Sequence, residues 1–155
     1  MLFRSYLEHP RNREAGAIDV QLEVSLETAQ HRATGQAPSP LSRTSFRHQY
    51  WSVAQMVAHH ASGGCNLRPG DLLGSGTISG PTRDEAGALI ELTTGGREPL
   101  TLNDGQQRSF LQDGDAVIFR GYCERAGFAR IGLGQNRGEV LPARANATAI
   151  KRTSV

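Results

Sequence analysis

Apolar and polar residues alternate along the segment from Ile18 to Leu26, which reads IDVQLEVSL. A period of two is typical of a β-strand that buries one face, so we predict a strand over these residues. The next stretch, residues 28–42, has no such period and contains Gly35, Pro38 and Pro40. Because proline removes amide donors and glycine resists ordering, this stretch predicts a surface loop.

A different spacing follows between Gln49 and Ala61. Apolar side chains there recur at intervals of three and four residues, namely at Tyr50, Val53, Ala54, Val57, Ala58 and Ala61. This spacing predicts an α-helix with one apolar face. Gly63 and Gly64 come directly after it and can adopt the left-handed conformation with which many helices end.

Beyond Asp71 the chain consists of short β-like runs separated by glycine-rich turns. The runs are Leu72 to Ser79, Leu89 to Thr93, Arg108 to Leu111, Ala116 to Cys123 and Phe128 to Gly134. The clearest turns are Asn103-Asp104-Gly105 and Asp113-Gly114-Asp115. Many short strands with one substantial helix predict a mainly β fold of the α+β class, with antiparallel pairing rather than βαβ units. Residues 144–155 are polar and unpatterned, so we expect a disordered tail there.

The composition suits one globular domain, with 155 residues of which 37% are hydrophobic and 21% charged. No apolar run approaches the roughly 20 residues of a membrane span and no secretory leader is evident, so we expect a cytoplasmic protein. The 17 Lys and Arg residues are dispersed and the net charge is +2, which disfavours nucleic-acid binding. Cys65 and Cys123 lack the spacing of a metal-binding pair, which predicts buried free thiols.

Two groups of polar residues have the right types for chemistry but the wrong spacing. Asp19 and Glu23 share one face of the first predicted strand, but four residues of strand separate them by roughly 13 Å, too far to bind one ion directly. We therefore expect a solvated strand face. His59 and His60 are adjacent on the predicted helix, so their side chains diverge by about 100°, whereas chelating pairs are spaced i, i+4. We expect no shared metal there.

Thr77 and Glu91 carry more specific signals. The segment from Gly74 to Gly80, GSGTISG, lacks the dinucleotide fingerprint and leads into a predicted strand, so a nucleotide site is not indicated. Its glycines indicate close approach of backbone or ligand, and Thr77 between them could offer a hydroxyl to a small polar ligand. Glu91 lies in the apolar run GALIEL and either faces solvent by alternation or is buried with a partner.

The order of these segments resembles a known enzyme family. The run from His59 to Pro81, HHASGGCNLRPGDLLGSGTISGP, closely resembles the signature segment of fumarylacetoacetases, preceded by their approach helix around Tyr50-Trp51. Residues 110–123, 130–135 and 140–143 resemble the closing strands of the same family. The resemblance implies that residues 1–143 form the C-terminal portion of the family's β-rich catalytic domain.

The resemblance also implies an activity, the hydrolysis of a carbon–carbon bond of 4-fumarylacetoacetate to fumarate and acetoacetate in tyrosine and phenylalanine degradation. In the family the substrate chelates Ca²⁺ or Mg²⁺, and a histidine activates the attacking water. Glu91 matches the glutamate that orients this histidine, and Thr77 matches a residue that contacts the substrate. The family's metal carboxylates and basic histidine lie upstream of the matching region, so we expect no metal ligand in this chain.

From this resemblance we expect the chain alone to be inactive, and the complete enzyme to be a homodimer that acts on a small molecule. Two alternatives stay open. One is another activity of the wider superfamily, such as acylpyruvate hydrolysis or decarboxylation. The other is a non-catalytic β module that complements a separate chain carrying the missing residues.

Overall fold

The computed structural model describes residues 5–144, and its centre is a four-stranded antiparallel sheet. The strand order is β2-β1-β5-β6, with bounds Ser39–Ser45, Gln21–Glu27, Ala116–Cys123 and Ile131–Glu139. A second, two-stranded sheet pairs β3 (Leu100–Thr101) with β4 (Gln107–Arg108). The α-helices are α1 (Pro10–Ala15), α2 (Ala29–Thr34), α3 (Val53–Ser62) and α4 (Leu89–Leu92). Single 3-10 turns lie at Ser5–Leu7, Phe46–His48 and Arg83–Glu85.

The α+β fold class and antiparallel pairing predicted from the sequence are confirmed. β1 and β5 are the inner strands, and each pairs with neighbours on both sides. Leu26 on β1 and Ala116 on β5 are completely buried, and Ile118 is 7% exposed, so the core lies where these strands meet. By contrast, every residue of the edge strand β6 is exposed.

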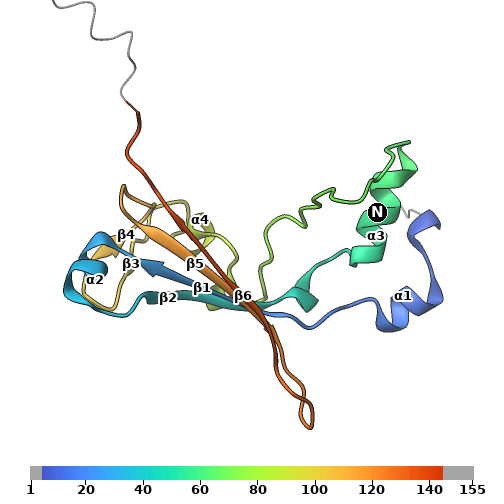
Figure 1. Ribbon diagram of the computed structural model, residues 1–155, viewed down its shortest axis with the longest axis horizontal. Helices are drawn as coiled ribbons and strands as arrows, with labels where there is room; N and C mark the ends of the chain where they lie inside the picture. The colour runs from blue at the N-terminus through green and yellow to red at the C-terminus, as the bar shows by residue number, and fades with distance from the viewer. Residues whose placement is uncertain (1–4, 145–155) are drawn as a thin grey trace, which may run out of the picture.

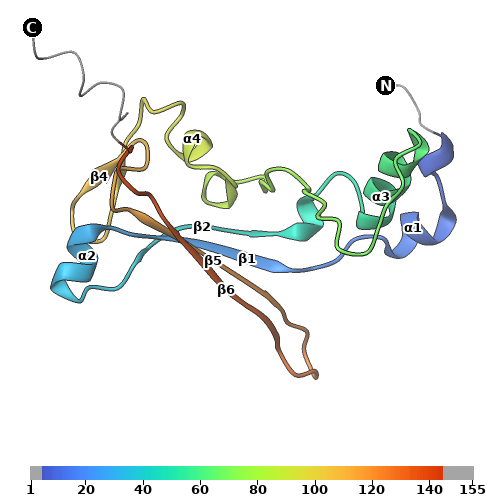
Figure 2. The same cartoon turned by 45° about the horizontal axis from the view of Figure 1, so that its top comes forward.

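Figures 1 and 2 show the sheet in the middle of the molecule, with different elements at its two ends. Helices α1 and α3 lie together at one end, whereas α2, β3 and β4 lie at the other. The segment that follows α3, drawn in green, returns from the first end toward the sheet and leads to α4. This return brings the glycine-rich segment 74–80 beside the sheet.

The predicted helix between Gln49 and Ala61 is confirmed as α3. Its N-cap is Ser52, whose hydroxyl accepts a hydrogen bond from the Gln55 amide, while the Gln55 side chain accepts from the Ser52 amide. This reciprocal capping box satisfies two amide donors that a helix start otherwise leaves unpaired. No helix within residues 5–144 has the length and apolar character to cross a bilayer.

The predicted loop over residues 28–42 is wrong, because α2 and most of β2 lie there. Helix α2 begins at a second capping box, formed by Thr28 and His31, and ends at Gly35 with a left-handed φ of 69°. Pro40 lies in the edge strand β2, opposite Ser25, where the register shifts. A proline is tolerated there because a bulge in an edge strand needs fewer ladder hydrogen bonds.

Several predicted strands also differ from the structure. Residues 72–79 form no strand, and residues 89–93 form α4 instead. The run at 108–111 shrinks to the two-residue β4, and the run at 128–134 shifts to β6. Short apolar runs fit strand and helix equally by periodicity, which explains α4. The predicted turns at 103–105 and 113–115 are confirmed.

Two smaller predictions concern the cysteines and the tail. Cys65 and Cys123 are free thiols as predicted, but Cys65 is exposed and Cys123 only partly buried, so the predicted burial is wrong. The predicted tail begins at Arg144, and its residues 145–155 lie outside the described part of the chain.

Candidate functional site

The segments that carry the two residues singled out from the sequence, Thr77 and Glu91, are joined through a third residue, Ser79. The Ser79 hydroxyl donates a hydrogen bond of 2.6 Å to Oε2 of Glu91, which lies on α4. The same hydroxyl oxygen accepts a hydrogen bond of 3.1 Å from the Gly87 amide. Ser79 therefore ties the glycine-rich segment to both the loop before α4 and α4 itself.

Gly87 brings this loop against Thr77. A Cβ atom added at Gly87 would lie 2.3 Å from the Ile78 carbonyl oxygen and 2.8 Å from Thr77 Cγ2, both far inside contact distance. Only glycine allows so close an approach. The predicted close backbone approach is not made by the glycines of segment 74–80, because Gly74 and Gly76 have nothing within 4 Å of an added Cβ and Gly80 meets the Glu85 side chain. Gly87, outside that segment, makes it instead. We call Thr77, Ser79, Gly87 and Glu91 the Thr77–Glu91 site.

A groove of ≈ 610 Å³ opens beside Thr77. One side of it is formed by residues 76–78 and Gly87, and the other by a face of the four-stranded sheet. The sheet contributes both polar and apolar side chains to this groove. Its charged lining residues are Glu23 and Arg120, and its apolar ones are Leu22, Val24, Phe119 and Leu133. A small ligand with apolar and oxygen-containing groups could pack against the apolar side chains of this groove and hydrogen-bond to its hydroxyl groups.

Thr77 and Glu91 are both exposed, and Glu91 does not line this groove. Of the two interpretations left open for Glu91, exposure agrees with the solvent-facing one, although Glu91 lies on a helix rather than a strand. Its hydrogen bond to Ser79 nevertheless gives the carboxylate a defined partner. The roles of Thr77 and Glu91 stay predictions.

The other candidates take part in separate contacts. Asp19 accepts hydrogen bonds from Ser45 at 2.6 Å and from Gln21 at 2.7 Å. Glu23 instead lies 3.7 Å from Arg43 Nε, so the two acids do not share a partner. His59 and His60 are both exposed on α3. His59 Nδ1 is 2.7 Å from the Tyr6 hydroxyl.

The described residues do not fit a divalent metal ion. Across residues 5–144, no three His, Cys, Asp or Glu side chains are grouped so that they could hold one. Ca²⁺ takes six to eight oxygen ligands and Mg²⁺ six, whereas the Thr77–Glu91 site offers one carboxylate and two hydroxyls.

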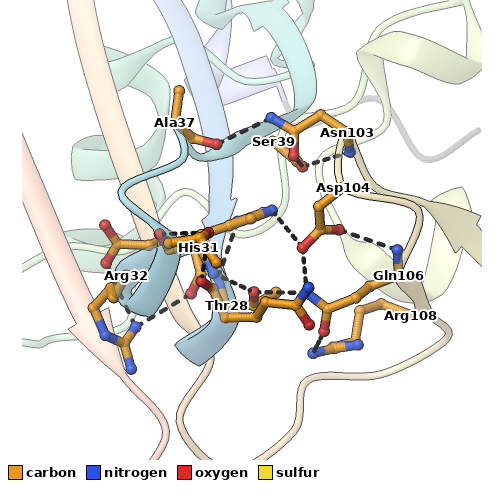
Figure 3. Close-up of polar contacts among 12 residues, drawn as sticks. Thr28, His31, Arg32, Ala37, Ser39, Asn103, Asp104, Gln106 and Arg108 are labelled. Atoms are coloured by element: carbon orange, nitrogen blue, oxygen red, sulfur yellow. Dashed lines mark hydrogen bonds and ion pairs between the residues drawn. The ribbon is translucent and has the colours of Figure 1, made fainter.

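A buried polar network between α2 and the β3–β4 turn was not predicted from the sequence (Figure 3). The His31 side chain is completely buried, and its Nδ1 accepts a hydrogen bond of 3.2 Å from the Thr28 amide. The ring proton must therefore be on Nε2, which lies 3.1 Å from Asp104 Oδ2 without hydrogen-bond geometry. The contact is thus one between a neutral imidazole and a carboxylate.

Gln106 connects the members of this network. Its side-chain amide donates to Asp104 and, at 2.9 Å, to the Thr28 hydroxyl, while its carbonyl oxygen accepts from Arg108 at 3.0 Å. Burial raises the pKa of Asp104, but the hydrogen bonds that its carboxylate accepts from Gln106 outweigh it, so the pKa is lowered. The network joins α2 to the small sheet at the end of the molecule remote from α3, which indicates a structural role.

Comparison with known proteins places the chain among related sequences. The C-terminal domain of fumarylacetoacetate (FAA) hydrolase matches residues 7–140. Human fumarylacetoacetase is 46% identical over 130 residues, which is 84% of this chain and 30% of the human protein. The Arabidopsis thaliana fumarylacetoacetase is 43% identical over 137 residues, and the Caenorhabditis elegans one is 43% identical over 140. The chain spans about 30% of the length of these relatives.

Proposed function

This chain belongs to the fumarylacetoacetate (FAA) hydrolase C-terminal family, and we propose that it supplies the C-terminal part of a fumarylacetoacetase active site. The fumarylacetoacetase relatives match it over more than four fifths of its length. The proposed substrate is 4-fumarylacetoacetate, and the proposed products are fumarate and acetoacetate.

The observation that carries this proposal is the hydrogen bond by which Ser79 joins the segment of Thr77 to Glu91. Thr77 and Glu91 are 14 positions apart in sequence, yet Ser79 and Gly87 hold their segments together. Thr77 borders a groove with apolar and polar surface, as a substrate that has a carbon chain and carbonyl groups requires. Glu91 presents a carboxylate next to this segment.

In the proposed reaction, water adds to a substrate carbonyl, the adjacent carbon–carbon bond breaks, and the departing carbon takes up a proton. Thr77 would donate or accept a hydrogen bond to the substrate and so fix its position. Glu91 would accept a hydrogen bond from the imidazole that deprotonates the water, holding the ring in the correct tautomer and stabilising its positive charge. That imidazole would come from another part of the complete active site.

The Ca²⁺ or Mg²⁺ that this family is expected to use would also be bound elsewhere, because residues 5–144 do not provide the ligands. We therefore propose that this chain alone has no hydrolase activity. Residues 1–143 would form the family's C-terminal catalytic portion, and the complete enzyme would be a cytoplasmic homodimer.

A chimera tests the proposal. The full 155-residue chain would replace the matching C-terminal region of human fumarylacetoacetase, and hydrolysis of fumarylacetoacetate would be measured with Mg²⁺ or Ca²⁺ present. We expect the chimera to be active, Glu91→Gln to lower kcat by about 10² to 10⁴-fold, and Thr77→Val to raise KM. Glu98→Gln is the matched control, because Glu98 is an exposed acid that pairs only with Arg83 among the described residues.

The same preparations separate the alternatives. Acylpyruvates and β-keto acids would be offered as substrates, and faster turnover of either would replace fumarylacetoacetate hydrolysis as the function. A chimera that folds and turns over none of these substrates would contradict the catalytic assignment. Stable association of the chain with a separate polypeptide, without any effect of Glu91→Gln on that partner's activity, would favour the non-catalytic module.

A further inference from the structure

The Ser79 hydroxyl has a fixed direction in its contacts with Gly87 and Glu91. A backbone amide can only donate, so the Ser79 oxygen must act as acceptor toward Gly87. The single hydroxyl proton is then available for the carboxylate, and the 2.6 Å distance to Glu91 Oε2 is typical of a charge-assisted O–H···O⁻ bond. The Ser79 hydroxyl therefore accepts a hydrogen bond from Gly87 and donates one to Glu91.

Glu91 has little else to hold its side chain. It is exposed, and α4 is only four residues long. Among the described residues, Ser79 is the hydrogen-bond partner of its carboxylate, and the second oxygen, Oε1, accepts no hydrogen bond there. A free glutamate side chain would sample several rotamers, whereas the Ser79 bond selects one and leaves Oε1 available to a second donor.

Gly87 supports the position of the Ser79 hydroxyl. Because Gly87 lies against Ile78 and Thr77 without a side chain, its amide reaches Ser79. One short stretch of backbone therefore sets the position of Thr77 and the donor that orients the Ser79 hydroxyl. Any displacement of Ser79 would change the position of Glu91 relative to Thr77.

We infer that Ser79 is a positioning residue, whose hydroxyl holds the Glu91 carboxylate in one orientation next to the segment that carries Thr77, with Oε1 free for the imidazole of the reaction. The catalytic meaning of this inference rests on the proposed function. The orientation of Glu91 itself can be measured without it.

The first experiment uses the full chain. NMR three-bond couplings would report the χ1 and χ2 rotamers of Glu91 in the native chain and in Ser79→Ala, Ser79→Thr and Ser109→Ala. We expect one rotamer in the native chain and in Ser79→Thr, and averaged couplings in Ser79→Ala. Ser109→Ala is the matched control, because Ser109 is a partly buried serine whose hydroxyl donates to the Gly96 carbonyl, away from Glu91. A single unchanged Glu91 rotamer in Ser79→Ala would overturn the inference.

The second experiment uses the chimera with human fumarylacetoacetase. We expect Ser79→Ala to lower kcat by about tenfold, the effect of losing one hydrogen bond to a charged group, with KM within about twofold and with recovery in Ser79→Thr. If Glu91→Gln abolishes turnover while Ser79→Ala does not reduce it, the inference fails and the proposed function stands. If Glu91→Gln has no effect, the proposed function fails, and the rotamers alone then decide whether Ser79 orients Glu91.

Discussion

Arg108 on β4 and Asp115, the residue before β5, form a bidentate buried ion pair. Arg108 Nε lies 2.9 Å from one carboxylate oxygen and a terminal nitrogen lies 3.2 Å from the other. Asp115 is 1% exposed and Arg108 8%, and Asp115 also accepts a hydrogen bond from the Gln112 amide. The pair thus attaches the small sheet to an inner strand of the large one.

Breaking this pair should be costly, because the guanidinium would stay buried without its counter-charge. We expect Asp115→Asn to lower the free energy of unfolding by about 3–5 kcal/mol, measured by urea denaturation. Glu98→Gln, which breaks the exposed pair with Arg83, should cost less than about 1 kcal/mol. Equal losses in the two variants would contradict the assignment of Arg108 and Asp115 to the core.

Glu27 should make stability depend on pH on the acid side. Hydrogen bonds from Arg137 lower the pKa of Glu27 below its ordinary 4.5, and the positive charges of Arg137 and Arg32 act in the same direction. Partial burial raises this pKa but does not outweigh them. A carboxylate with a lowered folded-state pKa stabilises the fold above its unfolded pKa, and this contribution is lost as pH falls through the folded value.

The urea midpoint of the native chain should therefore fall as the pH drops below about 4.5. Glu27→Gln should be less stable than the native chain at pH 7 and should lose less stability on acidification. Asp104, whose pKa is also lowered, keeps part of the acid dependence in the variant. A native chain and a Glu27→Gln variant with the same acid slope would show that the Arg137 contact does not contribute.

Gly87 should not tolerate a side chain. The added Cβ of alanine would overlap the Ile78 carbonyl and Thr77, so residues 76–78 must move away from Gly87. We expect Gly87→Ala to destabilise the chain by about 1–3 kcal/mol in urea denaturation and to raise KM in the chimera. Gly132→Ala is the control, because nothing lies within 4 Å of a Cβ at that position, and it should change stability by less than about 0.5 kcal/mol.

The elements predicted from the sequence are mainly those with a long periodic pattern. For β1 a period of 2 and for α3 a period near 3.6 are visible in the sequence over several residues, whereas β5 was predicted as a short run between turns. α2 and α4 have six and four residues, too few for a period to emerge. The signal for α2 was its capping box, which was hidden because its third helical residue is His31 rather than Glu or Gln.

In the candidate site, too, local sequence features were predictable and contacts between distant segments were not. The glycines of segment 74–80 predicted a close approach of backbone or ligand, but the close backbone approach beside Thr77 is made by Gly87, outside that segment. The position of Gly87 and the bond between Ser79 and Glu91 depend on how residues 80–91 turn back, which no local pattern specifies. Likewise, the contact of His31 with Asp104 joins residues 73 positions apart and needs the whole sheet to bring them together.

Thr28 gives a test of the buried network that includes this contact. Its completely buried hydroxyl accepts hydrogen bonds from the His31 amide at 3.1 Å and from the Gln106 side chain at 2.9 Å. Thr28→Ala removes the N-cap of α2 and leaves the Gln106 amide without this acceptor, so we expect a loss of about 1–3 kcal/mol in urea denaturation. Thr28→Ser keeps the hydroxyl and should recover most of that loss.

Hydrogen exchange should be faster at the α2 amides in Thr28→Ala than in Thr28→Ser, because α2 depends on this cap. The β1 amides should exchange equally in the two variants, because β1 is held by β2 and β5. Equal α2 exchange in the two variants would mean that the helix is held by packing alone, and the network would then have no part in ordering this end of the molecule.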